Sequence, residues 1–102
     1  MVASLCIQVE RVKQSRISQV DFADLPFGKI YTDHMFMADY RDGEWKNFRI
    51  VPYGHISISP ATPALHYGQS IFEGMKAMKS PTGEVLIFRA ADNWMRLNIS
   101  GE

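Results

Sequence analysis

The stretch HMFMADYRDGEWKNFRIV, residues 34–51, consists of two apolar runs joined by a turn sequence. In residues 34–40, apolar side chains fall on both faces of the predicted strand. This pattern is typical of a strand in the middle of a sheet. Asp42 and Gly43 favour a hairpin turn, because glycine tolerates positive φ and aspartate bonds the local backbone. Residues 44–51 form the predicted return strand. The stretch therefore predicts an antiparallel hairpin at the centre of the fold.

Shorter elements are predicted on both sides of this hairpin. Residues 1–26 form a predicted leader segment into the sheet, with a short strand at 7–12. On the C-terminal side the patterns predict a strand at 55–59, a short helix from Pro63 toward residue 68, a strand at 70–79, a turn at 80–83, a strand at 85–88, and a helix at 93–99 capped by Asp92. Connections of hairpin length favour an α+β fold, with an antiparallel or mixed β-sheet and flanking helices.

Composition excludes several classes of protein. The 102 residues include 11 Lys and Arg and 11 Asp and Glu, so the formal net charge is zero. This balance argues against a nucleic-acid partner or an anionic membrane surface held by bulk charge. The longest apolar run, residues 35–38, is too short to span a bilayer. The single cysteine, Cys6, predicts a reducing, cytoplasmic compartment.

Length limits what the chain can do alone. About 100 residues suit one domain with a small core, whereas a pocket for substrate and cofactor usually needs more protein. We therefore expect a binding module or a piece of a larger protein. The C-terminal Gly101 is compatible with a helix that ends there and equally with a helix cut short.

The residues alone give few candidates for chemistry. The histidines His34, His55 and His66 are not spaced to place two ligands on one helix face, so we expect no metal site. No nucleophile elbow or glycine-rich phosphate loop is present. Tyr67 and Phe72 each lie close to a glycine and suit a pocket wall, although core packing is the commoner role of aromatics.

Two arginines are candidates for binding an anion. Arg96 lies within the predicted C-terminal helix and could present a planar fork of donors. Arg89 lies at the end of the preceding strand and competes for this role. On the residues alone, a solvated arginine is the commoner outcome for both.

Five blocks of sequence carry a resemblance to a known family. They are Leu25–Phe36, Arg49–Gly54, Leu65–Ala77, Leu86–Arg89 and Asn93–Ser100. In this order they resemble the N-terminal part of branched-chain amino acid aminotransferases, pyridoxal-phosphate enzymes of fold type IV. The block LHYGQSIFEGMKA is characteristic of the class, and residues 27–35 point to its branched-chain members.

The resemblance implies a fold, an activity and site residues. Residues 1–102 correspond to the small N-terminal domain, and a second domain, absent from this chain, bears the cofactor-binding lysine. The whole enzyme would transfer an amino group between Leu, Ile or Val and 2-oxoglutarate through pyridoxal 5'-phosphate. Arg96 corresponds to the arginine that contacts the cofactor phosphate, and Phe27, Tyr67 and Phe72 correspond to aromatics of the substrate pocket. No catalytic residue lies in this chain, which alone is expected to be inactive.

Other interpretations remain open at this point. A D-amino-acid aminotransferase and an aminodeoxychorismate lyase share the fold, although residues 27–35 speak against both. A non-catalytic binding or assembly module is the alternative outside the class. A piece of a two-domain enzyme should expose apolar surface, which predicts a homodimer or self-association.

Overall fold

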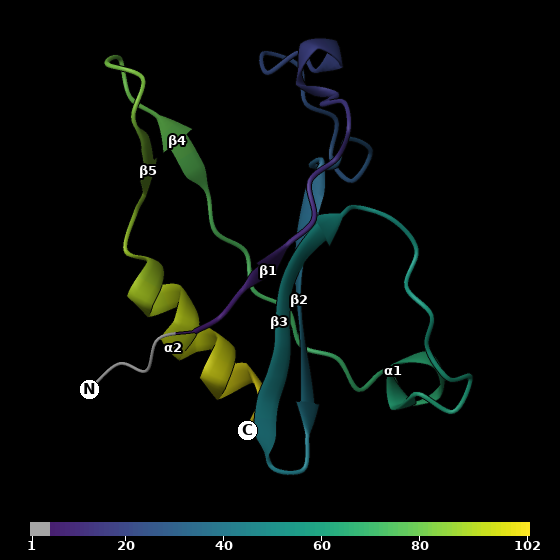
Figure 1. Ribbon diagram of the computed structural model, residues 1–102. Coiled ribbons are helices and arrows are strands. Elements are labelled where there is room, and N and C mark those ends of the chain that lie inside the picture. Colours follow the sequence, from purple (N-terminus) through teal and green to yellow (C-terminus); the bar gives the residue numbers. More distant parts are fainter. Residues whose placement is uncertain (1–4) are drawn as a thin grey trace. The chain divides into compact units, whose positions relative to one another are not determined.

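The computed structural model describes residues 5–102 (Figure 1), so the first four residues of the predicted leader segment lie outside the described residues. The chain divides into two compact units, Met1–Ile56 and Ser57–Glu102. Each unit has its own small sheet.

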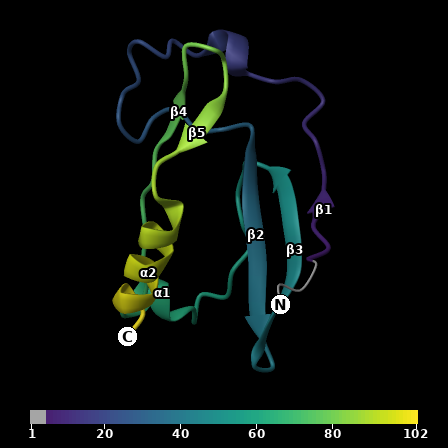
Figure 2. The ribbon, with the colours of Figure 1, turned by 90° about the vertical axis from the view of Figure 1, so that its left-hand side faces the viewer.

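The first unit contains a mixed three-stranded sheet. Its strands are β1 (Gln8–Val9), β2 (His34–Arg41) and β3 (Glu44–Pro52), in the order β1-β3-β2. Strand β2 pairs antiparallel with β3, and β1 pairs parallel with the other edge of β3, as Figure 2 shows. The predicted α+β class with a mixed sheet is confirmed. The prediction that residues 34–40 form the middle strand is wrong, because the leader adds β1 to β3 and leaves β2 outermost.

The hairpin turn follows from two residues. Arg41 pairs with Glu44, so the loop between β2 and β3 consists of Asp42 and Gly43 alone. Both have positive φ, 54° and 79°. A two-residue loop with two positive φ angles matches the right-handed twist of the flanking strands. The predicted hairpin is therefore confirmed.

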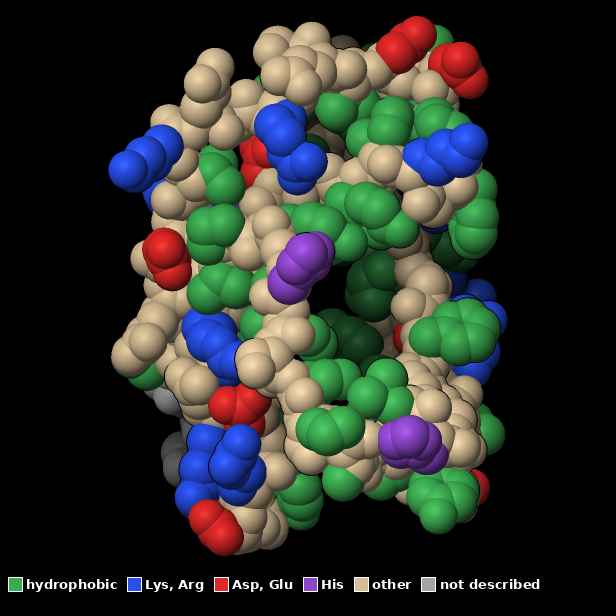
Figure 3. Space-filling model, turned by 90° about the vertical axis from the view of Figure 1, so that its right-hand side faces the viewer, with side chains coloured by type: hydrophobic (Ala, Val, Ile, Leu, Met, Phe, Trp, Pro, Cys, Tyr) green, Lys and Arg blue, Asp and Glu red, His purple; other side chains and the backbone are tan. Residues whose placement is uncertain are grey.

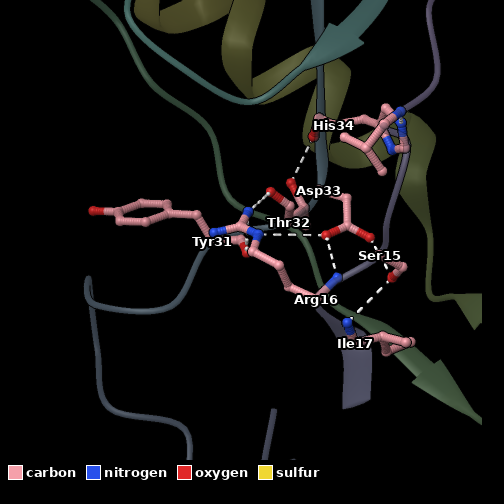
Figure 4. Close-up of polar contacts among 8 residues, drawn as sticks. Ser15, Arg16, Ile17, Tyr31, Thr32, Asp33 and His34 are labelled. Atoms are coloured by element: carbon pink, nitrogen blue, oxygen red, sulfur yellow. Dashed lines mark hydrogen bonds and ion pairs between the residues drawn. The ribbon is translucent and has the colours of Figure 1, made fainter. Parts of the chain in front are cut away.

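Polar contacts fasten the leader to the start of β2 (Figure 4). Asp33 accepts hydrogen bonds from the Ser15 hydroxyl at 2.5 Å and from the Arg16 backbone N–H at 3.0 Å. His34 Nε2 accepts a hydrogen bond from the Val12 backbone N–H at 3.0 Å. The Ser15 and Arg16 hydrogen bonds hold the pKa of Asp33 below its usual value. The leader is thus held by hydrogen bonds to charged and polar side chains.

The second unit contains two short helices and a two-stranded sheet. Its elements are α1 (Pro63–His66), β4 (Ala77–Lys79), β5 (Val85–Ile87) and α2 (Ala90–Ser100), and β4 pairs antiparallel with β5. The turn between the strands closes with a hydrogen bond from the Gly83 N–H to the Ser80 carbonyl at 2.9 Å. Proline at the first position of α1 is favoured there, because the missing N–H has no partner in any case.

Three predicted elements of the C-terminal half need correction. Residues 55–59 form no strand, and of the predicted strand at 70–79 only β4 is present. Alternating side chains define two faces, but a strand also needs a hydrogen-bonding neighbour, which these segments lack among residues 5–102. Helix α2 begins at Ala90, and its N-cap is Arg89 with φ of 51°. Asp92 is therefore not the cap; it lies in the first turn, where a carboxylate suits the helix dipole.

The described residues enclose no core. No side chain among residues 5–102 is fully buried, and hydrophobic side chains are spread over the surface, as on the face in Figure 3. The accessible surface is 9791 Å². Two separate compact bodies of half this mass would expose about 7,000 Å² in total. The expectation of exposed apolar surface is confirmed. Neither helix in the described part of the chain has the length and apolar character of a membrane span.

This excess apolar surface predicts self-association. We expect the 102-residue chain to form oligomers at micromolar concentration and to bind a hydrophobic dye, since no electrostatic repulsion opposes association at zero net charge. Sedimentation velocity across a concentration series measures this. Raising the salt concentration should not release monomers, because apolar contacts are not screened. A clean monomer that binds no dye would contradict the prediction.

Candidate functional site

Arg96 on helix α2 is ion-paired with Glu73 through two parallel hydrogen bonds. Its Nε–H donates to Glu73 Oε2 at 2.7 Å, and its Nη2 donates to Glu73 Oε1. The Glu73 side chain is 8% exposed, whereas that of Arg96 is 66% exposed. Two-pronged arginine–carboxylate pairs are strong and directional. The pair joins the extended segment before β4 to the middle of α2.

Asn93 completes this cluster from the preceding turn of the same helix. Residues three apart lie on one helix face, so Asn93 and Arg96 both reach Glu73. Asn93 Nδ2 donates to Glu73 Oε1 at 3.1 Å and to the Gly74 carbonyl at 2.9 Å. The Gly74 N–H also donates to Glu73 Oε1, at 3.1 Å. Glu73 is therefore held by an arginine, an amide and a backbone N–H.

These hydrogen bonds shift the titration of both charged groups. The bonds from Arg96 and, next, Asn93 lower the pKa of Glu73 from 4.5 to about 2. The carboxylate in turn raises the pKa of Arg96. Both shifts favour the ionised forms, so both groups carry their charges throughout the neutral range.

A surface hollow of about 590 Å³ brings Arg96 and Phe72 together. It is lined by Ser70, Ile71, Phe72, Glu73, Arg96 and Ser100. The Phe72 ring is 89% exposed. Two of the four predicted site residues, Arg96 and Phe72, thus line one hollow, and they bring a guanidinium and an aromatic ring to it.

Tyr67 and Phe27 lie outside this hollow. Tyr67 follows α1, donates its backbone N–H to the Pro63 carbonyl at 2.8 Å, and is 82% exposed. Phe27 belongs to the first unit, where its side chain is fully exposed beside Gly28, whose φ is 73°. The joint pocket of Phe27, Tyr67 and Phe72 therefore stays a prediction.

The competing anion site at Arg89 has a different environment. Arg89 Nη2 lies 2.5 Å from the Asp92 carboxylate, and its guanidinium lies 5.9 Å from the centre of the Phe88 ring. Both its partners are neighbours in sequence, and all three residues line a separate surface hollow of about 480 Å³. Among residues 5–102, no group of three or more His, Cys, Asp or Glu side chains is arranged to hold a metal ion.

The sequence interpretation missed Glu73, which proves to be the centre of the cluster. Glu73 and Arg96 are separated by 23 positions, so no local pattern links them. The one available signal was the spacing of Asn93 and Arg96, which places an amide and a guanidinium on a common helix face.

The lowered pKa of Glu73 predicts a specific pH dependence. Because the folded pKa lies below the ordinary value of 4.5, the pair contributes stability above about pH 4.5 and loses it as the pH falls toward 2. In Arg96→Gln the Glu73 midpoint should move up toward 4.5. Carbon NMR of the Glu73 carboxyl against pH measures the titration midpoint in the unchanged chain and in the variant. Asp92→Asn, which removes a carboxylate from the other arginine, should leave the Glu73 midpoint in place; an equal shift there would contradict the assignment.

Sequence comparison with known proteins relates this chain to a family. No protein-family model matches the chain. It is 47% identical over 98 residues to a "Probable branched-chain-amino-acid aminotransferase" of Staphylococcus aureus strain N315, covering 95% of this chain and 27% of that protein. The "Branched-chain-amino-acid transaminase 1" of Bacillus subtilis strain 168 is 45% identical over 83 residues, covering 80% and 23%. A "Branched-chain-amino-acid aminotransferase" of Mycobacterium tuberculosis strain CDC 1551 / Oshkosh is 47% identical over 75 residues, covering 72% and 20%.

The chain thus spans about a quarter of the length of the curated relatives that it matches. The similarity extends over most of the chain, including the segments that carry Glu73 and Arg96. This chain is therefore homologous to the N-terminal part of branched-chain amino acid aminotransferases, about 27% of their length.

Proposed function

We propose that this chain is the N-terminal domain of a branched-chain amino acid aminotransferase. The whole enzyme exchanges an amino group between Leu, Ile or Val and 2-oxoglutarate, and it acts as a cytoplasmic homodimer. The observation that supports this proposal is 47% identity over 95% of the chain.

Arg96 is the proposed anchor for the cofactor phosphate. Its two bonds to Glu73 use two of the five N–H groups of a guanidinium and leave the others for a second anion. The exposed guanidinium fits a phosphate, which accepts paired hydrogen bonds from one arginine. Pyridoxal 5'-phosphate, when bound, supplies the electron sink for amino-group transfer. The contribution of Arg96 is to bind and orient it.

The proposed substrate wall consists of Phe27, Tyr67 and Phe72. Aromatic faces bury the methyl groups of branched aliphatic side chains, and each methylene contributes about 1–3 kcal/mol of discrimination. Phe72 supports this role, because it lines the same hollow as Arg96. An aromatic wall beside the phosphate anchor would place the substrate side chain at a fixed distance from the cofactor.

The lysine that holds the cofactor is proposed to lie outside this chain. The chain has five lysines, and none stands at a position matching the cofactor-binding lysine of the family: Lys13, Lys29, Lys46, Lys76 and Lys79. Covalent catalysis by an amine needs that side chain. The 102-residue chain alone should therefore be inactive.

A chimera tests the proposed activity. Residues 1–102 are joined to the part of the S. aureus relative that follows its aligned segment. We expect the chimera to transfer the amino group of leucine to 2-oxoglutarate, and the chain alone to show no transfer. In the chimera, Arg96→Ala should raise the concentration of pyridoxal 5'-phosphate needed for half-maximal activity about tenfold or more, since it removes charge-assisted hydrogen bonds. A folded chimera that binds cofactor but prefers D-alanine or transfers nothing would refute the proposal.

The same chimera tests the substrate wall. Phe72→Ala should lower kcat/KM for leucine about tenfold relative to alanine, because a lost ring leaves the leucine methyl groups in contact with water. Steady-state kinetics with both amino acids measure the ratio. Phe88→Ala is the control, since that ring is equally exposed but lies beside Arg89. Equal losses for leucine and alanine in Phe72→Ala would contradict a role in specificity.

A further inference from the structure

The two edges of the Arg96 guanidinium have different surroundings. Glu73 occupies the edge formed by Nε and Nη2. The remaining N–H groups lie on Nη1 and on the far side of Nη2, and together they form a second fork. A guanidinium held along one edge can therefore present the other edge to a second anion in a defined orientation.

The carboxylate that holds Arg96 is itself tightly held. The Glu73 side chain is 8% exposed and accepts hydrogen bonds from Asn93 and from the Gly74 backbone, as well as from Arg96. Arg96 is 66% exposed and would otherwise sample many rotamers. The anchored partner is thus the carboxylate, and the arginine takes its orientation from it.

We propose that Glu73 and Asn93 are positioning residues for Arg96, holding its guanidinium so that the outer edge meets the phosphate of the cofactor. This inference rests on the proposed function, in which Arg96 is the phosphate anchor. Neither Glu73 nor Asn93 touches the phosphate. Asn93 acts one step further away, because it fixes the carboxylate that fixes the arginine.

Charge and position predict opposite effects of removing Glu73. The Glu73 carboxylate neutralises much of the positive charge of Arg96. If attraction by charge alone governed phosphate binding, Glu73→Gln would strengthen it. If orientation governs binding, Glu73→Gln weakens it, because the amide of glutamine cannot accept both N–H bonds. The sign of the change separates the two explanations.

The experiment uses the chimera labelled with nitrogen-15, because residues 1–102 alone are expected to self-associate, and inorganic phosphate is the probe. The Arg96 side-chain N–H resonances report its pairing with Glu73, and their shifts during a phosphate titration give a dissociation constant. We expect Glu73→Gln to abolish the paired signature and to weaken phosphate binding about twofold to fivefold, the range for a partly exposed ion pair. Asn93→Ala should weaken it less. Asp92→Asn, which frees Arg89 from its carboxylate, is the matched control and should leave the Arg96 titration unchanged.

The outcomes separate the inference from the proposed function. If phosphate shifts Arg96 in the unchanged chain and binds Glu73→Gln equally well or better, the positioning role is wrong and the phosphate role stands. If phosphate does not shift Arg96 in the unchanged chain, the phosphate role itself fails. The backbone resonances of α2 show whether each variant keeps the helix. If Glu73→Gln loses the helix, the test falls to Asn93→Ala, because that variant keeps the ion pair. If Asn93→Ala then binds phosphate as tightly as the unchanged chain, the inference is overturned.

Discussion

Neither unit buries a side chain completely among residues 5–102, and this shortage of burial governs the structure of each unit. An amphipathic sheet or helix is stabilised chiefly by covering its apolar side. Here hydrogen bonds hold the segments of each unit together instead. In the first unit these are the β2–β3 ladder and the Asp33 contacts, and in the second they are the bonds of the Glu73 cluster. Polar contacts of this kind fix local geometry but contribute little net free energy. The relatives that the chain matches are about four times as long.

The charges of the candidate site do not balance the charge of a phosphate group. Glu73 and Arg96 together are neutral, whereas a phosphate monoester carries nearly two negative charges at neutral pH. The outer fork of Arg96 can orient this group but cannot balance its charge. Two hydroxyls, Ser70 and Ser100, line the same hollow and add polarity without charge. If a phosphate binds at Arg96 as proposed, the remaining compensation comes from donors or cations beyond this cluster.

The sequence predicted those features that depend on adjacent residues. Asp42 and Gly43 determine the hairpin turn by themselves, and Pro63 begins α1 without help from distant parts of the chain. The alternation in residues 55–59 and 70–76 was misleading, because it reports which side chains share a face and not whether a neighbouring strand exists. The middle strand was misassigned for a related reason. Apolar side chains on both faces of β2 indicated cover on both sides, which a sequence cannot attribute to this chain or to another part of the protein.

The site shows the same division between local and distant information. Arg96 was already a candidate from its place in the predicted helix, and the resemblance favoured it over Arg89. Its partner Glu73 was missed, since 23 positions separate two groups whose contact depends on the fold. That contact has a second consequence, because Phe72 precedes Glu73 in the chain. Fixing Glu73 to Asn93 and Arg96 also limits how far Phe72 can move from α2. The distance between the Phe72 backbone and Arg96 is therefore limited within this unit by covalent geometry and three side-chain contacts. In a transaminase, that separation would determine how large a side chain fits between the cofactor and the wall.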